Sequence, residues 1–220
     1  MVRVILAGFL VSCSLLVAPP GHAYPDSCPP TCDQIPATAW PASWTLPLYP
    51  SSHWPTLAGL ARPAPQPRFL FEQLCGTQRV AADPRLYAVA STPGVAPPPG
   101  QWQLRAQILH WRGETWQGGQ WTMSVFDEAR AALQSCRSEV VQPSITTDEP
   151  DRLAAELTGP VTIHQYLVAH PQSSTLSELV FWVEPGPDGR PEVPWPAPPD
   201  AQVLEAMTTP LCGAYLSSCG

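Results

Sequence analysis

Two apolar stretches decide the fold: Val161-Thr-Ile-His-Gln-Tyr-Leu-Val-Ala169 and Leu176-Ser-Glu-Leu-Val-Phe-Trp-Val183, joined by His170-Pro-Gln-Ser-Ser-Thr175. Both stretches have the length and the β-branched and aromatic content of a strand, and the short polar connection is typical of a β-hairpin with a longer loop. Alternation divides the first strand between the two faces of a sheet. One face carries Val161, Ile163, Gln165, Leu167 and Ala169, and the other carries Thr162, His164, Tyr166, Val168 and His170.

A further strand lies upstream, over 101–111, where apolar and polar residues alternate. Such alternation predicts a half-buried strand with one face in the core and the other in water. Strands are also expected at 86–90 and 140–146. The apolar face of the 101–111 strand consists of Trp102, Leu104, Ala106 and Ile108, and the polar face of Gln103, Arg105 and Gln107.

Helices are expected in three places, at 122–136, 151–157 and 200–219. The first follows Gly118-Gly119, which we interpret as a break in the chain. The third is ended or kinked at Pro210, because proline lacks the amide hydrogen that a helix interior uses. The first helix has an apolar stripe with helical spacing, formed by Met123, Phe126, Ala129, Leu133 and Cys136.

These elements follow one another without a regular strand–helix–strand repeat, and the chain contains the hairpin described above. That order predicts an α+β fold with a mostly antiparallel sheet and two or three packed helices. We expect a Pro-rich N-terminal arm and disulfide bonds to complete it.

The composition limits the function classes. The chain has 220 residues and a net charge of −7; its basic residues are 11 Arg, with no Lys. An acidic chain without a basic stripe is a poor nucleic-acid binder, because it cannot release phosphate counterions. Lys and Asn, which have A-rich codons, are both absent, which indicates a bacterial genome of high GC content. The length allows a single domain, at 68–220, preceded by an arm.

Residues 1–23 have the features of a secretory signal peptide. Arg3 precedes an apolar run over 4–18, and small residues occupy the positions before a cut after Ala23. The run is shorter than the ~20 residues of a spanning helix, so we expect a secreted or envelope-associated protein without a membrane span. An alternative interpretation is a lipoprotein, because Leu10-Val-Ser-Cys13 resembles a lipobox.

Residues 24–67 contain 11 prolines together with Trp40, Trp44 and Trp54. Proline excludes long helices and central strands, so we expect an extended arm. Its tryptophans and cysteines favour an arm held against the domain, with the tryptophans filling the gap to the sheet. The alternative is a disordered mature N-terminus.

Six cysteines remain after removal of the signal peptide, and an exported chain with an even number favours three disulfides. Their connectivity stays open. A bridge within the short Cys28–Cys32 segment is sterically awkward, and Cys212 and Cys219 in a helix would have Cα atoms ~10 Å apart, too far to bridge. We therefore expect each of these four to pair elsewhere. The six are Cys28, Cys32, Cys75, Cys136, Cys212 and Cys219.

Common catalytic motifs are absent. The sequence has no Gly-x-Ser-x-Gly elbow, no His-Glu-x-x-His and no lysine for a Schiff base or phosphate loop. His164 and His170 share a face but stand ~20 Å apart along a strand, too far to share a metal. We expect no cofactor and no metal. A Ser-His-Asp triad assembled in space stays open, since triads follow no fixed order.

Candidate ligand-facing residues come from the aromatic content. Exposed tryptophan stacks on sugars or anchors protein interfaces. Carboxylates Glu114, Asp127 and Glu128 flank two tryptophans, and a carboxylate pair ~5–9.5 Å apart could hydrolyse glycosidic bonds. The alternative is that Asp127 and Glu128 are first-turn helix charges. The candidates are Trp111, Trp116, Trp121, Glu114, His164 and Tyr166, of which His164 is the first to examine for a shifted pKa.

The order of signal peptide, Pro-rich arm, strand, helix ending in Cys136, hairpin and C-terminal helix with Cys212 resembles exported α+β proteins of mycobacteria and related actinobacteria. Extracellular sensor domains of some of their receptor kinases are of this kind, and the resemblance covers roughly residues 75–219. It implies a small disulfide-bonded domain with a cleft and brings no enzymatic residues. We expect a non-enzymatic binding or structural module of the cell envelope, with a protein or glycan partner; the alternative is a hydrolase of envelope polymers that uses paired carboxylates.

Overall fold

The computed structural model describes residues 32–139, 141–184, 190–215 and 218–219, so the expected signal peptide and Cys28 lie outside the described part. The strands are β1 (Arg62–Pro63), β2 (Val89–Thr92), β3 (Gly94–Val95), β4 (Trp102–His110), β5 (Gln142–Asp148), β6 (Arg152–Thr158), β7 (Ile163–His170) and β8 (Thr175–Val183). The α-helices are α1 (Tyr49–Ser52), α2 (Leu57–Leu60), α3 (Leu70–Leu74), α4 (Thr115–Gln134) and α5 (Asp200–Ala214). Short 3₁₀ turns are η1 (Ala37–Ala39), η2 (Ser43–Thr45), η3 (Pro84–Tyr87) and η4 (Pro171–Ser173).

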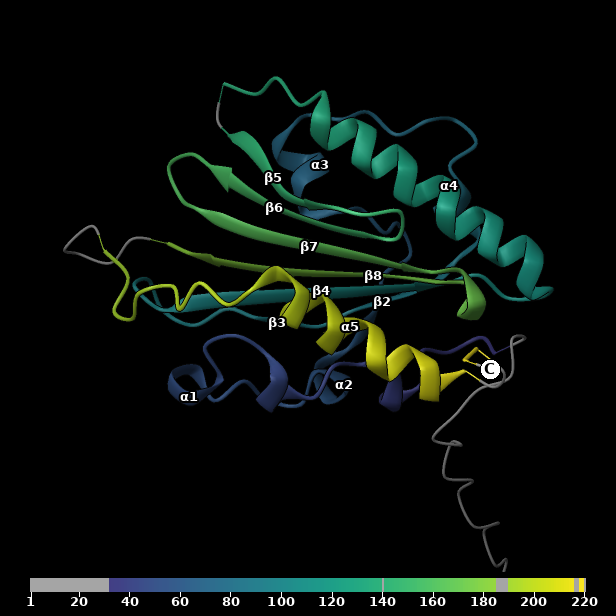
Figure 1. Cartoon of the computed structure of the whole chain (residues 1–220), viewed down its shortest axis with the longest axis horizontal. Helices are drawn as coiled ribbons and strands as arrows, with labels where there is room; N and C mark the ends of the chain where they lie inside the picture. The colour runs from purple at the N-terminus through teal and green to yellow at the C-terminus, as the bar shows by residue number, and fades with distance from the viewer. Residues whose placement is uncertain (1–31, 140, 185–189, 216–217, 220) are drawn as a thin grey trace, which may run out of the picture.

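The strands form one antiparallel sheet in the order β1-β2-β4-β8-β7-β6-β5, with β3 beside β4. Helix α4 covers one face, and α5 together with the N-terminal segment covers the other (Figure 1). The α+β class and the mostly antiparallel sheet predicted from the sequence are confirmed. Two hydrophobic clusters, one on each face, form the core.

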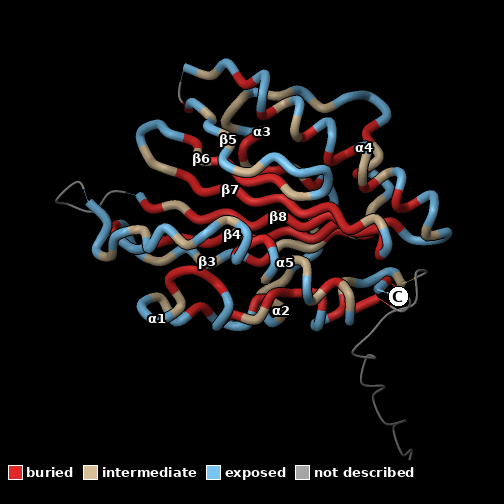
Figure 2. Tube along the Cα trace, in the orientation of Figure 1, coloured by how far each residue is buried: buried red, intermediate tan, exposed pale blue. Residues whose placement is uncertain are grey.

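The central strands confirm the predicted hairpin and its alternation. β7 and β8 pair from Ile163–Trp182 to His170–Thr175, and β8 also pairs with the whole of β4. The apolar face of β4 lies in the cluster beneath α5. The opposite face is buried as well, because the α3 and α4 layer covers it, so the expected half-exposure of β4 is wrong. Figure 2 shows these central strands as almost continuously buried.

Helix α4 carries the predicted apolar stripe against the sheet, but it begins at Thr115. Gly118 and Gly119 lie inside it and do not break the chain. A Cβ atom at Gly118 would overlap the side chain of Ser174, and one at Gly119 would lie 2.8 Å from the carbonyl oxygen of Pro171. The two glycines therefore permit α4 to pass close to the β7–β8 turn.

On the opposite face, the Pro-rich segment from residue 32 to residue 61 packs with α5 against the sheet. Trp40, Trp54 and Leu57 are buried there, and the indole nitrogen of Trp54 donates a hydrogen bond of 2.7 Å to the carbonyl oxygen of Pro47. Burying large aromatic groups contributes apolar area that a sheet with few long helices otherwise lacks. Trp44 is the exception, since its side chain is 73% exposed.

The predicted helix at 151–157 is wrong, because these residues form most of β6. The segment Arg-Leu-Ala-Ala-Glu-Leu has high helix propensity, but β6 pairs on one side with β5 and on the other with β7. Propensity is a weak preference that tertiary pairing overrides. The strand expected at 140–146 corresponds to β5. The strand expected at 86–90 corresponds to the end of the 3₁₀ turn η3 and the beginning of β2.

Two disulfides connect described cysteines. Cys75, at the end of α3, pairs with Cys136, just after α4. Cys212 pairs with Cys219, with Cα atoms 5.1 Å apart, which corrects the expectation that they would bond to different partners. The helix ends at Ala214 and Tyr215 is extended, so helical spacing does not apply between Cys212 and Cys219. Cys32 is also disulfide-bonded.

Helix α5 contains Pro210 without ending there. Among the helices that the structure describes, none combines the length and the apolarity needed to cross a membrane.

Candidate functional site

The ligand-facing residues expected from the sequence do not gather at one site. Trp111 is fully buried on the α4 side, where its indole nitrogen donates to the carbonyl oxygen of Pro84. Trp121 is half-buried on α4, whereas Trp116 is 65% exposed at its first turn. His164 and Tyr166 are buried on the opposite face of the sheet. A shared site for these residues is therefore not assembled.

The expected carboxylate pair is not assembled either. Glu114 precedes α4, and Asp127 and Glu128 lie in its middle, so they are not first-turn charges. Thirteen residues of helix separate Glu114 from Asp127 by ~20 Å, well beyond the ~5–9.5 Å of glycosidase pairs. Adjacent helix residues such as Asp127 and Glu128 do not face one another.

His164 is held in an aromatic stack. Its ring lies parallel to that of Trp195, with centroids 3.9 Å apart, and Trp102 is also in contact. Burial lowers the pKa of His164 to about 4, although Asp200 acts in the opposite direction. The imidazole is therefore neutral at pH 7, and its 3.8 Å approach to Glu156 is not an ion pair under those conditions. This histidine fixes the loop of Trp195 to the sheet.

A groove of about 800 Å³ lies between the N-terminal segment and α5. Its size falls within the range of small-ligand sites, ~300–1,000 Å³. Trp40 and Leu46 belong to its wall and also to the core, so the wall is rigidly supported. Trp44 is the exposed aromatic of the lining. Prolines from both sides complete the apolar lining: Pro47, Pro50, Pro196, Pro198 and Pro210.

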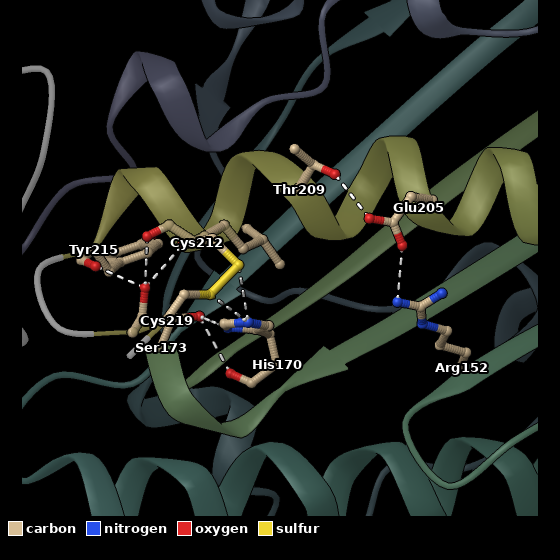
Figure 3. The surroundings of a disulfide bond; sticks show 10 residues. Arg152, His170, Ser173, Glu205, Thr209, Cys212, Tyr215 and Cys219 are labelled. Atoms are coloured by element: carbon tan, nitrogen blue, oxygen red, sulfur yellow. Dashed lines mark hydrogen bonds and ion pairs between the residues drawn. A yellow bond between two sulfur atoms is a disulfide. The ribbon is translucent and has the colours of Figure 1, made fainter.

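Polar groups in this groove are few. Glu205 is the one carboxylate among the described lining residues, with Gln202 and three threonines as the other polar groups. The Glu205 carboxylate forms an ion pair of 3.0 Å with Arg152 and accepts a hydrogen bond from the Thr209 hydroxyl (Figure 3). Among the described lining residues there is thus no second carboxylate to form the kind of pair that glycosidases use.

A second cluster lies at the other end of α5, around the Cys212–Cys219 disulfide. His170, the last residue of β7, points its ring at the disulfide, with Nε2 3.8 Å from the Cys212 sulfur and 3.7 Å from the Cys219 sulfur (Figure 3). Its Nδ1 lies 2.7 Å from the Ser173 hydroxyl. Burial lowers the pKa of His170, against the opposing charge of Asp151. The ring is therefore buried, neutral and fixed beside sulfur.

The α4 face holds buried charges of a different kind. Arg85 forms ion pairs with Glu72 at 2.7 Å and with Asp83 at 2.8 Å, and all three are buried. Burial opposes ionisation, but the hydrogen bonds to Arg85 outweigh it and lower the pKa of Asp83. Nearby, burial raises the pKa of Glu178 to about 7, even though Gln165 and the Leu70 amide donate hydrogen bonds to it. These charges lie in the interior beneath α3 and α4, and the hollows that the described residues form on this side lie elsewhere, at the two ends of α4.

Sequence reasoning missed both the groove and the histidine–disulfide cluster. The groove joins residues 38–50 to residues 196–210, and no local pattern indicates that pairing. The cluster depends on α5 ending at Ala214, whereas the sequence pattern predicted a helix to residue 219. Comparison with protein-family models, curated protein sequences and solved structures finds no match to the chain.

Proposed function

We propose that this protein is an exported, non-enzymatic binding module of a bacterial cell envelope, and that the groove between the N-terminal segment and α5 is its ligand site. The observation that carries the proposal is an apolar groove with one exposed aromatic, Trp44, and one carboxylate that is already paired. A hydrolase would need converging polar groups there. The signal-like residues 1–23 support export, and the disulfides are compatible with it.

An extended, proline-containing peptide segment of an envelope protein fits this groove better than a glycan. A glycan presents hydroxyl groups that need many polar partners, and the lining offers few. Proline-rich segments instead dock on grooves lined by aromatic residues, because their extended helix is preformed and loses little entropy on binding. Trp44 would stack on a proline of the partner.

The binding test uses fluorescence anisotropy with a library of short labelled proline-rich peptides. We expect saturable binding to the wild type and at least a ~10-fold weaker affinity for Trp44→Ala, which removes the exposed aromatic anchor. Trp116→Ala is the matched control, since Trp116 is equally solvent-facing but lies on α4. Equal affinity of Trp44→Ala and wild type would contradict the proposal, as would binding only to cell-wall glycan fragments.

Export is tested separately by the intact mass of the protein recovered outside the cytoplasm of a high-GC actinobacterial host. We expect a chain that begins at Tyr24 and has lost six hydrogens to three disulfides. A chain that begins at a lipidated Cys13 would make it an anchored lipoprotein. Retention with Met1 would contradict export.

A further inference from the structure

We propose that reduction of the Cys212–Cys219 disulfide creates a site for Zn²⁺, with the two thiolates and Nε2 of His170 as ligands. The three ligand atoms already lie within 4.8 Å of one another. The set of two sulfurs and one imidazole nitrogen is one that zinc prefers, and it leaves a fourth position for water or another ligand. This inference does not depend on the groove.

The distance from the His170 imidazole nitrogen to each sulfur already matches the separation of two ligands on one zinc ion. Tetrahedral zinc, with Zn–S of ~2.3 Å and Zn–N of ~2.0–2.1 Å, places sulfur and nitrogen ligands ~3.6 Å apart. Nε2 of His170 lies 3.8 Å from one sulfur and 3.7 Å from the other. Breaking the disulfide would free the sulfurs to separate around a cation without moving β7.

The other ring nitrogen is held as metal-binding histidines usually are. Metal-ligating imidazoles commonly donate their second N–H to an oxygen, which fixes the tautomer. The Ser173 hydroxyl donates to the carbonyl oxygen of His170, so its oxygen is left to accept from Nδ1–H at 2.7 Å. That arrangement turns the lone pair of Nε2 toward the sulfurs (Figure 3).

The C-terminal segment has an anchor besides the disulfide. The Ser218 hydroxyl lies 3.1 Å from the carbonyl oxygen of Leu211, 3.0 Å from that of Cys212 and 2.6 Å from that of Tyr215. These contacts hold Ser218 against the end of α5. Cys219 would therefore stay beside His170 after its bond to Cys212 is broken.

The step that opens the site is thiol–disulfide exchange with a dithiol reductant. A reductant thiolate attacks the exposed Cys219 sulfur, the Cys212–Cys219 bond breaks, and the second reductant thiol resolves the mixed disulfide. The reductant leaves as a disulfide after giving two electrons and two protons to the protein sulfurs. Zn²⁺ then binds both sulfurs as thiolates and releases those two protons.

Accessibility favours this disulfide over the other described one. Cys219 is exposed and Cys212 half-buried, whereas Cys136 is buried in the cluster beneath α4. With limiting dithiol, alkylation and mass spectrometry should label Cys212 and Cys219 before Cys75 and Cys136. Earlier labelling of Cys75 and Cys136 would overturn the proposal, because the site could not then open in the folded protein.

The direct test adds Co²⁺, a spectroscopic substitute for Zn²⁺, to the full-length protein. Selectively reduced wild type should bind one equivalent and show thiolate-to-cobalt charge transfer, and Zn²⁺ should displace the Co²⁺. The oxidised protein should show no such band, a comparison that needs no variant. Absence of the band in the reduced protein would overturn the proposal.

Variants separate the imidazole from the thiols. His170→Gln keeps every cysteine and should weaken Zn²⁺ binding by more than ~10-fold. Mutating a residue that only orients a metal ligand already costs about that much affinity, and His170 is a ligand itself. His164→Gln is the matched control, because His164 is a buried histidine on the same face of β7 and should leave the affinity unchanged. Equal Zn²⁺ affinity of His170→Gln and wild type would show that cysteines alone bind the metal.

Discussion

The two faces of the sheet are stabilised in different ways. The α4 face combines an apolar stripe with buried ion pairs and the Cys75–Cys136 disulfide. The α5 face rests on aromatic packing of a proline-rich segment, and it carries both the groove and the histidine–disulfide cluster. The α4 layer is therefore held by buried charges and a long disulfide loop, whereas the layer that carries the proposed ligand groove is held by aromatic packing.

The largest expected change in the free energy of unfolding comes from a substitution on the α4 face. Arg85→Ala leaves the carboxylates of Glu72 and Asp83 buried without their main partner, and we expect it to lower the free energy of unfolding by ~3–5 kcal/mol. Arg152→Ala is the control on the α5 face. It removes an ion pair whose carboxylate is 60% exposed, which should cost less than ~1 kcal/mol. Urea unfolding curves measure both, and similar costs would contradict the contrast between the faces.

Glycines provide a second comparison. Gly118→Ala forces α4 away from the β7–β8 turn and should destabilise the protein by ~1–3 kcal/mol, the usual cost of overpacking. Gly213→Ala in α5 meets no atom within 4 Å and should be neutral or stabilising by up to ~1 kcal/mol, because alanine favours helix. Thermal melts of the two variants test this. A harmless Gly118→Ala would mean that the close approach is not needed.

Among the buried groups with shifted pKa values, Glu178 on the α4 face and His164 on the α5 face should make opposing contributions to the pH dependence of stability. The folded pKa of Glu178, about 7, lies above its ordinary 4.5, so its contribution is full below pH 4.5 and is lost as the pH rises to 7. The folded pKa of His164, about 4, lies below its ordinary 6.5, so its contribution is full above pH 6.5 and is lost as the pH falls to 4. The two slopes partly cancel in the wild type.

Single variants should separate these slopes. Glu178→Gln should remain folded with a stability that rises with pH between 4 and 6.5, and it should be more stable than wild type at pH 8 by ~1–3 kcal/mol. In His164→Gln, stability should instead rise less, or fall more steeply, with pH over this range than in the wild type, because the contribution of Glu178 remains. Denaturant unfolding at a series of pH values gives both curves. Parallel curves for the two variants would exclude this assignment.

Much of the fold could be predicted because it depends on local alternation. The faces of β4 and β7 follow from period-two patterns, and the stripe of α4 from helical spacing. β6 could not be predicted in this way. Its own residues favour a helix, and it forms a strand because it pairs with both β5 and β7. Gln103 and Gln107 are likewise buried because the layer of α3 and α4 covers them, which the sequence of β4 itself does not indicate.

The sites depended on contacts between distant segments. The groove joins two proline-rich stretches about 150 residues apart, and prolines leave no periodic signal that predicts a partner. His170 was visible as a histidine at the end of a strand. The two sulfur atoms beside it could not be predicted, because the sequence pattern around Cys212 and Cys219 is helical beyond Ala214, where α5 ends.

The smallest expected effect on stability is at the groove. Trp44→Ala should change the free energy of unfolding by less than ~0.5 kcal/mol, since the side chain is largely in water. Trp54→Ala, which empties a buried position of the same segment, should cost ~3–5 kcal/mol. Urea unfolding of both variants checks the difference. A large loss for Trp44→Ala would mean that this residue supports the fold and is not reserved for a ligand.

Binding in the groove can be observed directly by a two-dimensional NMR titration of the tryptophan indole signals with a proline-rich peptide from the binding screen. If the groove is the ligand site, the signals of Trp40 and Trp44, which line it, should shift saturably, and those of Trp111, Trp116 and Trp121 on the α4 side should stay unchanged. Shifts confined to the α4-side tryptophans would contradict it, because the peptide would then bind the opposite face of the sheet from the groove.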